Sequence, residues 1–201
     1  SFMSSTLGNG LRSPIQGDLP TDGSVPAVVW VSDFYRVGPP PVVRGVRVSP
    51  LPPQVRAAVA GGGFGADRSD PSTVRRAVQA RGPDGTWAVW SYLSTAGSER
   101  NVVTGPRRDD GFGFICGLRG AIANCGGTRG LQIYAVPPAA ATLRFLLPGG
   151  RERLADAVGN GWAILVGPRR TATAAGPAVR VEALDASGRV VGRLTERVAL
   201  P

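Results

Sequence analysis

The side chains that the chain lacks decide which chemistry is open to it. Its 201 residues contain no histidine, and all 23 basic residues are arginine, so lysine is absent as well. Without these two residue types the chain cannot form a Ser-His or Cys-His nucleophile pair, a lysine Schiff base, a phosphate-loop lysine or a histidine metal site. We therefore predict that the protein is not an enzyme and holds no cofactor and no metal.

Carboxylates are the remaining candidates for chemistry, since glycoside hydrolysis requires two facing carboxyl groups. Asp109 with Asp110, or Asp33 beside Tyr35, could supply such a pair. The two adjacent aspartates follow two arginines, however, as in a charged turn, and Glu152 lies between two arginines that can pair with it. We interpret these residues as structural, and a secreted carbohydrate-active enzyme that uses carboxylates stays as an alternative.

The chain has two cysteines, Cys116 and Cys125, within the glycine-rich stretch 111–136. They could form a disulfide, a free pair in a reducing cytosol, or half of a metal site. A closed zinc site would need carboxylates to complete it, which structural zinc rarely uses. We predict the disulfide, and with it an extracytoplasmic location for a secreted or membrane-tethered protein.

Apolar side chains alternate along the two segments that flank the cysteines, namely Phe112, Phe114 and Cys116 before the glycines and Leu131, Ile133 and Ala135 after them. Alternation with a period of two is typical of half-buried strands. We expect these segments to pair as one β-hairpin that the disulfide staples. The closed loop is short, so the bond should stabilise the fold by roughly 2–3 kcal/mol.

The binding hypothesis rests on a predicted strand that contains Trp87, Trp90 and Tyr92. Trp87 would face one side of its sheet, and Trp90 with Tyr92 the other. If the sheet packs on one side only, Trp90 and Tyr92 stay exposed and form the centre of a contact with a protein partner or a glycan. Arg76 and Arg81 would flank this contact. The alternative is that both faces are buried, which makes all three aromatic residues part of the core.

The net charge of +9 raises the question of a polyanion partner. The arginines are spread from Arg12 to Arg197, a pattern that favours a GC-rich coding bias over a dedicated surface. Nucleic acid is therefore not an expected partner, and binding to DNA or heparin should be weak and vanish near physiological salt. An arginine-based polyanion binder stays as a second alternative.

The fold class follows from 29 glycines and 18 prolines that separate many short β-rich segments. We predict an all-β fold, either an antiparallel β-sandwich or two packed β-subdomains, with short hairpins and one or two short helices. One helix is expected at 52–60, and residues 73–80 fit either a strand or a helix. Strands are expected at 27–31, 42–48, 74–81, 86–93, 101–104, 141–147, 151–156, 162–166, 178–184 and 189–195.

The same composition predicts three parts. Residues 1–24 read as a flexible arm that begins with a vector remnant, so we expect an export signal or anchor to precede the natural chain. Residues 25–136 form a β-rich subdomain with the disulfide hairpin, and residues 141–201 a C-terminal subdomain of hairpins. The boundary is expected at Pro137-Pro138, although the two could form one continuous domain.

Four segments carry a family resemblance: LQIYAVPP at 131–138, LRFLLPGG at 143–150, GWAILV at 161–166 and VRVEALDASGRVVG at 179–192. Together they resemble the extracytoplasmic β-domain of membrane-tethered actinobacterial proteins, some of them similar to anti-sigma factors. The resemblance implies a non-catalytic domain outside the membrane, joined to an N-terminal anchor. It supplies no functional residues. The function we expect is a sensor or binding module whose partner is a protein or a glycan.

Overall fold

The computed structural model describes residues 43–61, 68–107, 110–114, 116, 121–128, 130–168, 176–198 and 200. Within this part of the chain there are three antiparallel sheets of four strands each and one α-helix. The predicted all-β class is therefore confirmed. The arm at 1–24 and the strand at 27–31 lie outside the described residues.

Each sheet is built largely from neighbouring hairpins. Sheet 1 has the order β1 (Ser69–Gly82), β2 (Gly85–Ser94), β3 (Glu99–Thr104) and β4 (Phe112–Phe114). Sheet 2 has the order β5 (Ala123–Thr128), β6 (Leu131–Ala135), β10 (Trp162–Val166) and β9 (Ala157–Gly159). Sheet 3 has the order β12 (Val190–Arg197), β11 (Ala178–Leu184), β7 (Thr142–Leu146) and β8 (Glu152–Leu154).

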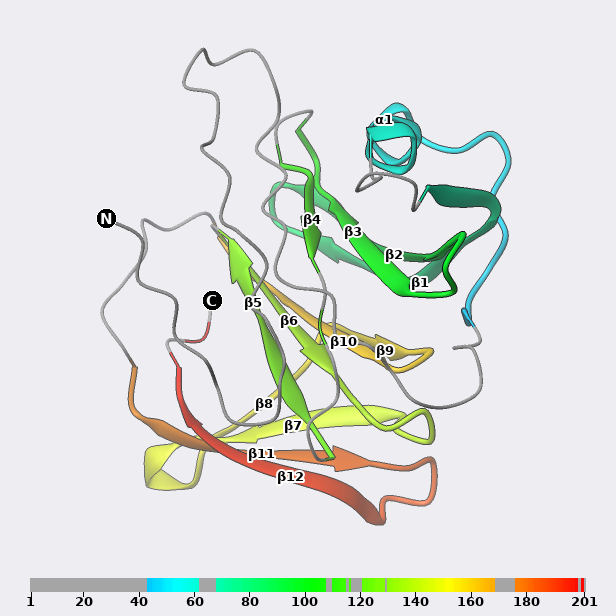
Figure 1. Ribbon diagram of the computed structural model, residues 1–201. Helices are drawn as coiled ribbons and strands as arrows, with labels where there is room; N and C mark the ends of the chain where they lie inside the picture. The colour runs from blue at the N-terminus through cyan, green and yellow to red at the C-terminus, as the bar shows by residue number, and fades with distance from the viewer. Residues whose placement is uncertain are drawn as a thin grey trace, which may run out of the picture.

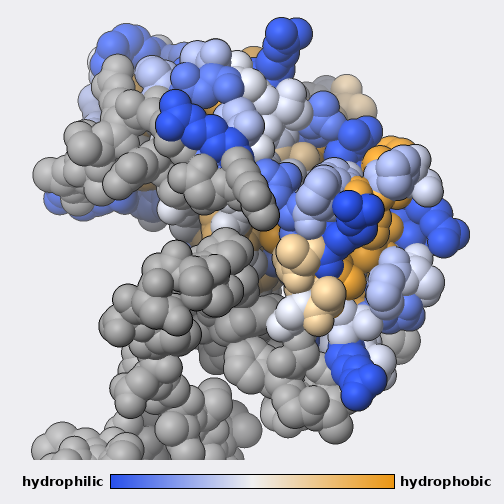
Figure 2. All heavy atoms as spheres, turned by 90° about the horizontal axis from the view of Figure 1, so that it is seen from above, coloured by the Kyte–Doolittle hydropathy of each residue, from blue (hydrophilic) through white to orange (hydrophobic). Residues whose placement is uncertain are grey.

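The elements stack in four layers, with α1 (Pro53–Gly61) on sheet 1, sheet 1 on sheet 2, and sheet 2 on sheet 3 (Figure 1). A separate cluster of buried apolar side chains fills each of the three spaces between these layers. Seen from above, the molecule presents mainly hydrophilic side chains with smaller apolar areas between them (Figure 2). Sheet 3 is the last layer of the stack in Figure 1, so one of its faces packs against sheet 2 and the other faces away from it.

Sheet 2 is the central layer, and its strands show why the sequence 162–166 is continuously apolar. Trp162 and Ile164 of β10 pack toward sheet 1, whereas Ala163 and Leu165 pack toward sheet 3. All five residues of this strand are buried. A strand covered on both faces has no solvent-facing side, so the polar half of the usual alternation is missing.

Three of the predicted hairpins are confirmed. Gly82 pairs with Gly85 across the turn between β1 and β2, which decides for a strand over a helix at 73–80. The hairpins β7–β8 and β11–β12 also form as expected, and the helix begins one residue later than predicted. The segment 42–48 differs: within its described residues, Val46 makes only an isolated bridge with Arg76.

The single hairpin expected over residues 111–136 is wrong. β4 pairs with β3 in sheet 1, and β6 pairs with β5 in sheet 2. The predicted disulfide between Cys116 and Cys125 is present, with the two Cα atoms 5.5 Å apart. Cys116 follows β4 and Cys125 lies in β5, so the bond joins two sheets rather than two strands of one hairpin.

The strands on either side of Pro137-Pro138 share sheet 2. β6 precedes this point and β10 follows it, and the two strands pair from Trp162 opposite Ala135 to Val166 opposite Leu131. A division of the chain here would separate hydrogen-bonded neighbours. The pairing of β6 with β10 thus crosses the predicted boundary.

Candidate functional site

The aromatic pair expected at the surface is buried. Trp90 and Tyr92 are only 3% and 1% exposed, because Val55 and Val59 of α1 pack against their face of sheet 1. The indole Nε1 of Trp90 donates a hydrogen bond to Thr104 Oγ1 at 3.0 Å. The expectation of an exposed pair is wrong, and the alternative in which both faces of β2 are core is the observed one.

The two arginines expected beside that pair do reach its face of the sheet. Arg76 stands opposite Trp90 and Arg81 opposite Thr86 in the pairing of β1 with β2, and directly opposite residues share a face. Arg81 is exposed and Arg76 is half-buried. Burial raises the pKa of Tyr92, while a hydrogen bond with Ser69 and the charge of Arg100 oppose the shift. These contacts describe a packed core edge, in which Trp90 and Tyr92 are not open to a ligand.

The carboxylates proposed for catalysis make structural contacts where they are described. Asp110 Oδ2 accepts a hydrogen bond from the backbone N–H of Arg107 at 2.9 Å, as in a turn. Glu152 lies 3.7 Å from Arg144 on the neighbouring strand. Asp109, Asp33 and Tyr35 lie outside the described residues. Among the described residues no group of three metal-ligating side chains occurs, and no helix is long and apolar enough to span a membrane.

The outer face of sheet 3 carries a group of charged side chains that the sequence analysis did not predict. Its inner side chains, such as Phe145 and Val181, fill the core against sheet 2. The residues between them along each strand point outward, by the period-two alternation of a strand. The charged outward residues of these strands are Arg144, Glu152, Arg180, Glu182, Arg193 and Arg197. We call this surface the sheet 3 outer face.

Glu182 is the centre of this face and is buried by arginines. Its side chain is 5% exposed. Arg144 Nη2 donates to Glu182 Oε2 at 2.6 Å, and the Nε atoms of Arg180 and Arg193 lie 3.4 and 3.5 Å from Oε1. The hydrogen bond from Arg144 lowers the pKa of Glu182; burial opposes the shift and the charge of Arg180 adds to it. Arg180 and Glu182 thus lie on the same face of β11, but only the arginine is exposed.

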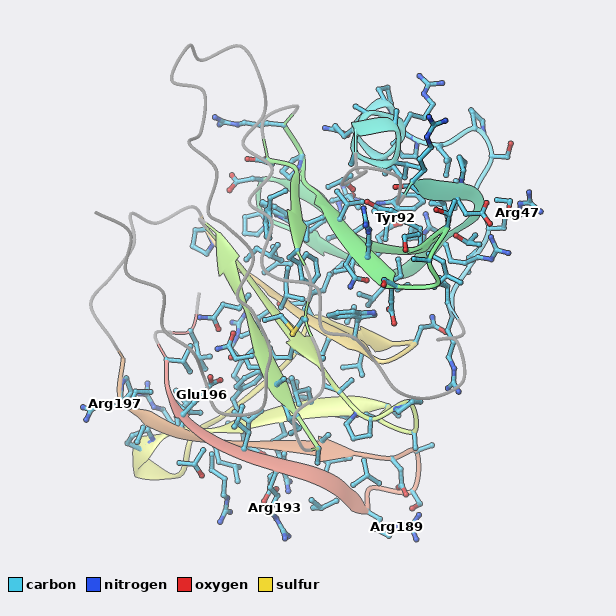
Figure 3. The ribbon with its side chains drawn as sticks, viewed as in Figure 1. Arg47, Tyr92, Arg189, Arg193, Glu196 and Arg197 are labelled. Atoms are coloured by element: carbon cyan, nitrogen blue, oxygen red, sulfur yellow. A yellow bond between two sulfur atoms is a disulfide. The ribbon has the colours of Figure 1, made fainter. Side chains whose placement is uncertain are left out.

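The arginines around Glu182 stay accessible. The side chains of Arg180 and Arg193 are 61% and 68% exposed, and both reach Glu182 through Nε. Arg197 is exposed further along β12, and Figure 3 shows Arg193 and Arg197 projecting outward from this strand. Thr195 stands opposite Arg180 and between these two arginines. Arg180, Arg193 and Arg197 are therefore the neighbours of Thr195 in the strand register of this face.

A polar contact between sheets 2 and 3 holds β12 in place. Tyr134 of β6 donates its hydroxyl hydrogen bond to Glu196 Oε1, and Asn124 of β5 donates to Oε2, both at 2.7 Å. Burial raises the pKa of Tyr134, and the hydrogen bond and the charge of Glu196 raise it further. Glu196 lies on the inner side of β12, so this contact anchors the strand whose outer side carries Arg193 and Arg197.

No protein-family model, no curated protein and no solved structure matches this chain.

Proposed function

We propose that this chain is a non-enzymatic binding module of an extracytoplasmic protein, secreted or membrane-anchored. The extracytoplasmic part is supported by the disulfide between Cys116 and Cys125, because disulfides persist in oxidising compartments and are rare in a reducing cytosol. The binding part is assigned to the sheet 3 outer face.

One observation carries that assignment: four arginines from three adjacent strands share one solvent-facing sheet surface. Arginine is enriched among residues that dominate binding energy, because its planar fork can make several hydrogen bonds at little extra entropic cost. Glu182 holds two of these forks at their Nε atoms. A surface with prearranged donors loses less conformational freedom on binding than a surface of unrestrained side chains.

The test is a binding screen with three proteins: wild type, the double variant R180A/R193A and the control R44A/R47A. Both variants remove two positive charges. Arg44 and Arg47 are exposed beside sheet 1, and Figure 3 shows Arg47 well away from Arg193 and Arg197. The immobilised probes are a displayed peptide library, heparin and neutral oligosaccharides.

We expect at least one probe to bind wild type and control equally and R180A/R193A about tenfold more weakly, as for loss of a central interface contact. Equal losses in the two variants would indicate a general charge effect. That result, or no effect of either variant, would contradict the assignment of the surface.

A further inference from the structure

We infer that the ligand of the sheet 3 outer face is an acidic protein segment that presents apolar side chains next to its carboxylates. This inference rests on the proposed function and names the partner's chemistry. It comes from two properties of the face that adjoin one another: an excess of positive charge on one half, and the exposed Leu154 with the half-buried Leu146 on the other.

The charge selects an anionic partner. The strands of this face carry four outward arginines against two glutamates, an excess of two positive charges. Three of the arginines, Arg180, Arg193 and Arg197, lie on β11 and β12, whereas Glu152 lies on β8 at the opposite edge. The guanidinium fork matches the two oxygens of a carboxylate. The β11–β12 half is therefore complementary to aspartate and glutamate side chains.

The leucines of the face favour a protein as the anionic partner. Leu154 of β8 is 54% exposed, one of two large apolar side chains exposed among the described residues. It stands opposite Arg144, and Leu146 stands opposite Arg180 and Glu152. These two leucines are diagonal neighbours beside the arginines. Protein interfaces combine arginine with apolar contacts in this way, whereas an anionic polysaccharide would leave the leucines without an apolar partner.

Nucleic acid fits the face less well. Single strands bind by stacking their bases on exposed aromatic side chains. Of the chain's four tryptophans, the three that the structure describes are buried, namely Trp87, Trp90 and Trp162. The outward residues of the sheet 3 strands include no aromatic side chain. A protein segment uses both halves of the face, and a nucleic acid would use only the arginines.

Glu182 is a positioning residue in this arrangement. It holds Arg180 and Arg193 through Nε, and so keeps their exposed ends side by side for an incoming carboxylate. This role makes a prediction opposite to simple electrostatics. The variant E182Q raises the net charge of the face by one. If the face only attracts anions, E182Q should bind the acidic segment more tightly than wild type. If binding needs ordered arginines, E182Q should bind it more weakly.

The experiment selects peptides from a displayed random library on wild-type protein. A recovered peptide is then synthesised, and its Kd is measured by fluorescence anisotropy at physiological salt. The proteins compared are wild type, R180A/R193A, E182Q, L154S and the control R44A/R47A. Circular dichroism first confirms that each variant is folded. Heparin and a single-stranded oligonucleotide serve as probes of the other anionic classes.

The inference expects recovered sequences rich in Asp or Glu next to apolar residues. Their affinity should fall about tenfold or more in R180A/R193A, by several-fold in E182Q and L154S, and by less than about twofold in the control. Recovery of no peptide, or of peptides without acidic residues, overturns the inference. Tighter peptide binding by E182Q, or unchanged binding by L154S, also overturns it.

The remaining outcomes separate the inference from the proposed function. One such outcome is that heparin or the oligonucleotide binds wild type more tightly than any selected peptide does. Its affinity would fall in R180A/R193A and stay unchanged in the control R44A/R47A. The protein ligand would then be wrong, and the sheet 3 outer face would remain the binding surface. Probes of every class that bind R180A/R193A as well as wild type would overturn both proposals.

Discussion

Arg144 Nη2 lies 2.6 Å from Glu182 Oε2, and the two residues stand directly opposite each other on β7 and β11. β7 belongs to the hairpin β7–β8, and β11 belongs to the hairpin β11–β12. The ion pair therefore joins the outer sides of two hairpins that are separate in the sequence. It also places a carboxylate where Arg180 and Arg193 can reach it.

Replacing Glu182 by Gln should lower the free energy of unfolding by about 1–2 kcal/mol at neutral pH, because charged hydrogen bonds are lost while the arginines remain partly solvated. The pKa of Glu182 is lowered in the folded state. Its contribution is thus fully present above the unfolded value of about 4.3 and disappears as the pH falls through the folded value. Urea unfolding from neutral to acidic pH should show the difference from wild type shrinking toward zero.

Two comparisons isolate this effect. E152Q removes an exposed carboxylate that lies 3.7 Å from the same Arg144, and it should change stability by less than about 0.5 kcal/mol. The pKa of Asp185 is also lowered, to about 2, mainly by the hydrogen bond from Ser187. That acid slope is common to wild type and E182Q, so it cancels in the difference. A loss in E182Q that persists undiminished in acid would contradict the ion-pair explanation.

Replacing Trp90 by Ala should cost about 3–5 kcal/mol of stability, as expected for a large buried aromatic side chain. The indole is buried under α1 and its N–H is bonded to Thr104. Denaturant unfolding measures the loss. T86A is the control, because Thr86 is exposed on the same strand, and it should be nearly neutral. An unchanged stability of W90A would mean that the helix does not cover this face.

Much of the fold could be predicted from the sequence because it depends on local rules. The turn between Gly82 and Gly85 and the alternation of Val179, Val181 and Ala183 are properties of neighbouring residues. The partner of β4 is not such a property. Strands that follow one another usually pair, and for this reason the segments that form β4 and β6 were expected as one hairpin. They lie in different sheets, although the predicted cysteine pairing is correct.

The candidate site was hidden for a related reason. Arg144, Arg180 and the β12 residues Arg193 and Arg197 come from three separate segments of the sequence, and they share one surface only because β11 pairs with both β7 and β12. Spread along a chain, such residues look like a compositional bias. The prediction for Trp90 and Tyr92 failed for the opposite reason. The local pattern of aromatic residues indicated an exposed surface, but α1, a separate segment of the chain, covers that face of β2. The signal that could have helped is the alternation Arg193, Thr195, Arg197 on one side of β12.

The double variant C116S/C125S should lose roughly 2–3 kcal/mol of stability, because the unfolded chain regains the entropy of a short loop. The disulfide closes a sequence separation of 9 residues. Thermal unfolding of wild type with a reductant should match that of the variant without one, and the variant should not respond to reductant. Thiol titration of unreduced, denatured wild type should find no free thiol from these cysteines. Two reactive thiols would contradict the bond and the compartment inferred from it.

Replacing Tyr134 by Phe tests the contact that anchors β12. The change leaves Glu196 with its bond from Asn124 but removes the hydroxyl donor at 2.7 Å, so we expect a loss of about 1–2 kcal/mol near neutral pH.

The pKa of Tyr134 is raised in the folded state, first by burial and then by Glu196. A raised folded pKa means that the stability of wild type is fully present below the unfolded tyrosine value of about 10 and falls as the pH rises above it. The pKa of Tyr92 is raised as well, but that residue is present in both proteins and cancels in the comparison. Urea unfolding at neutral and alkaline pH should therefore show Y134F losing less stability than wild type as the pH rises past about 10. Parallel alkaline slopes for the two proteins would mean that Tyr134 titrates as it does in the unfolded chain, and that the bond to Glu196 does not hold sheets 2 and 3 together.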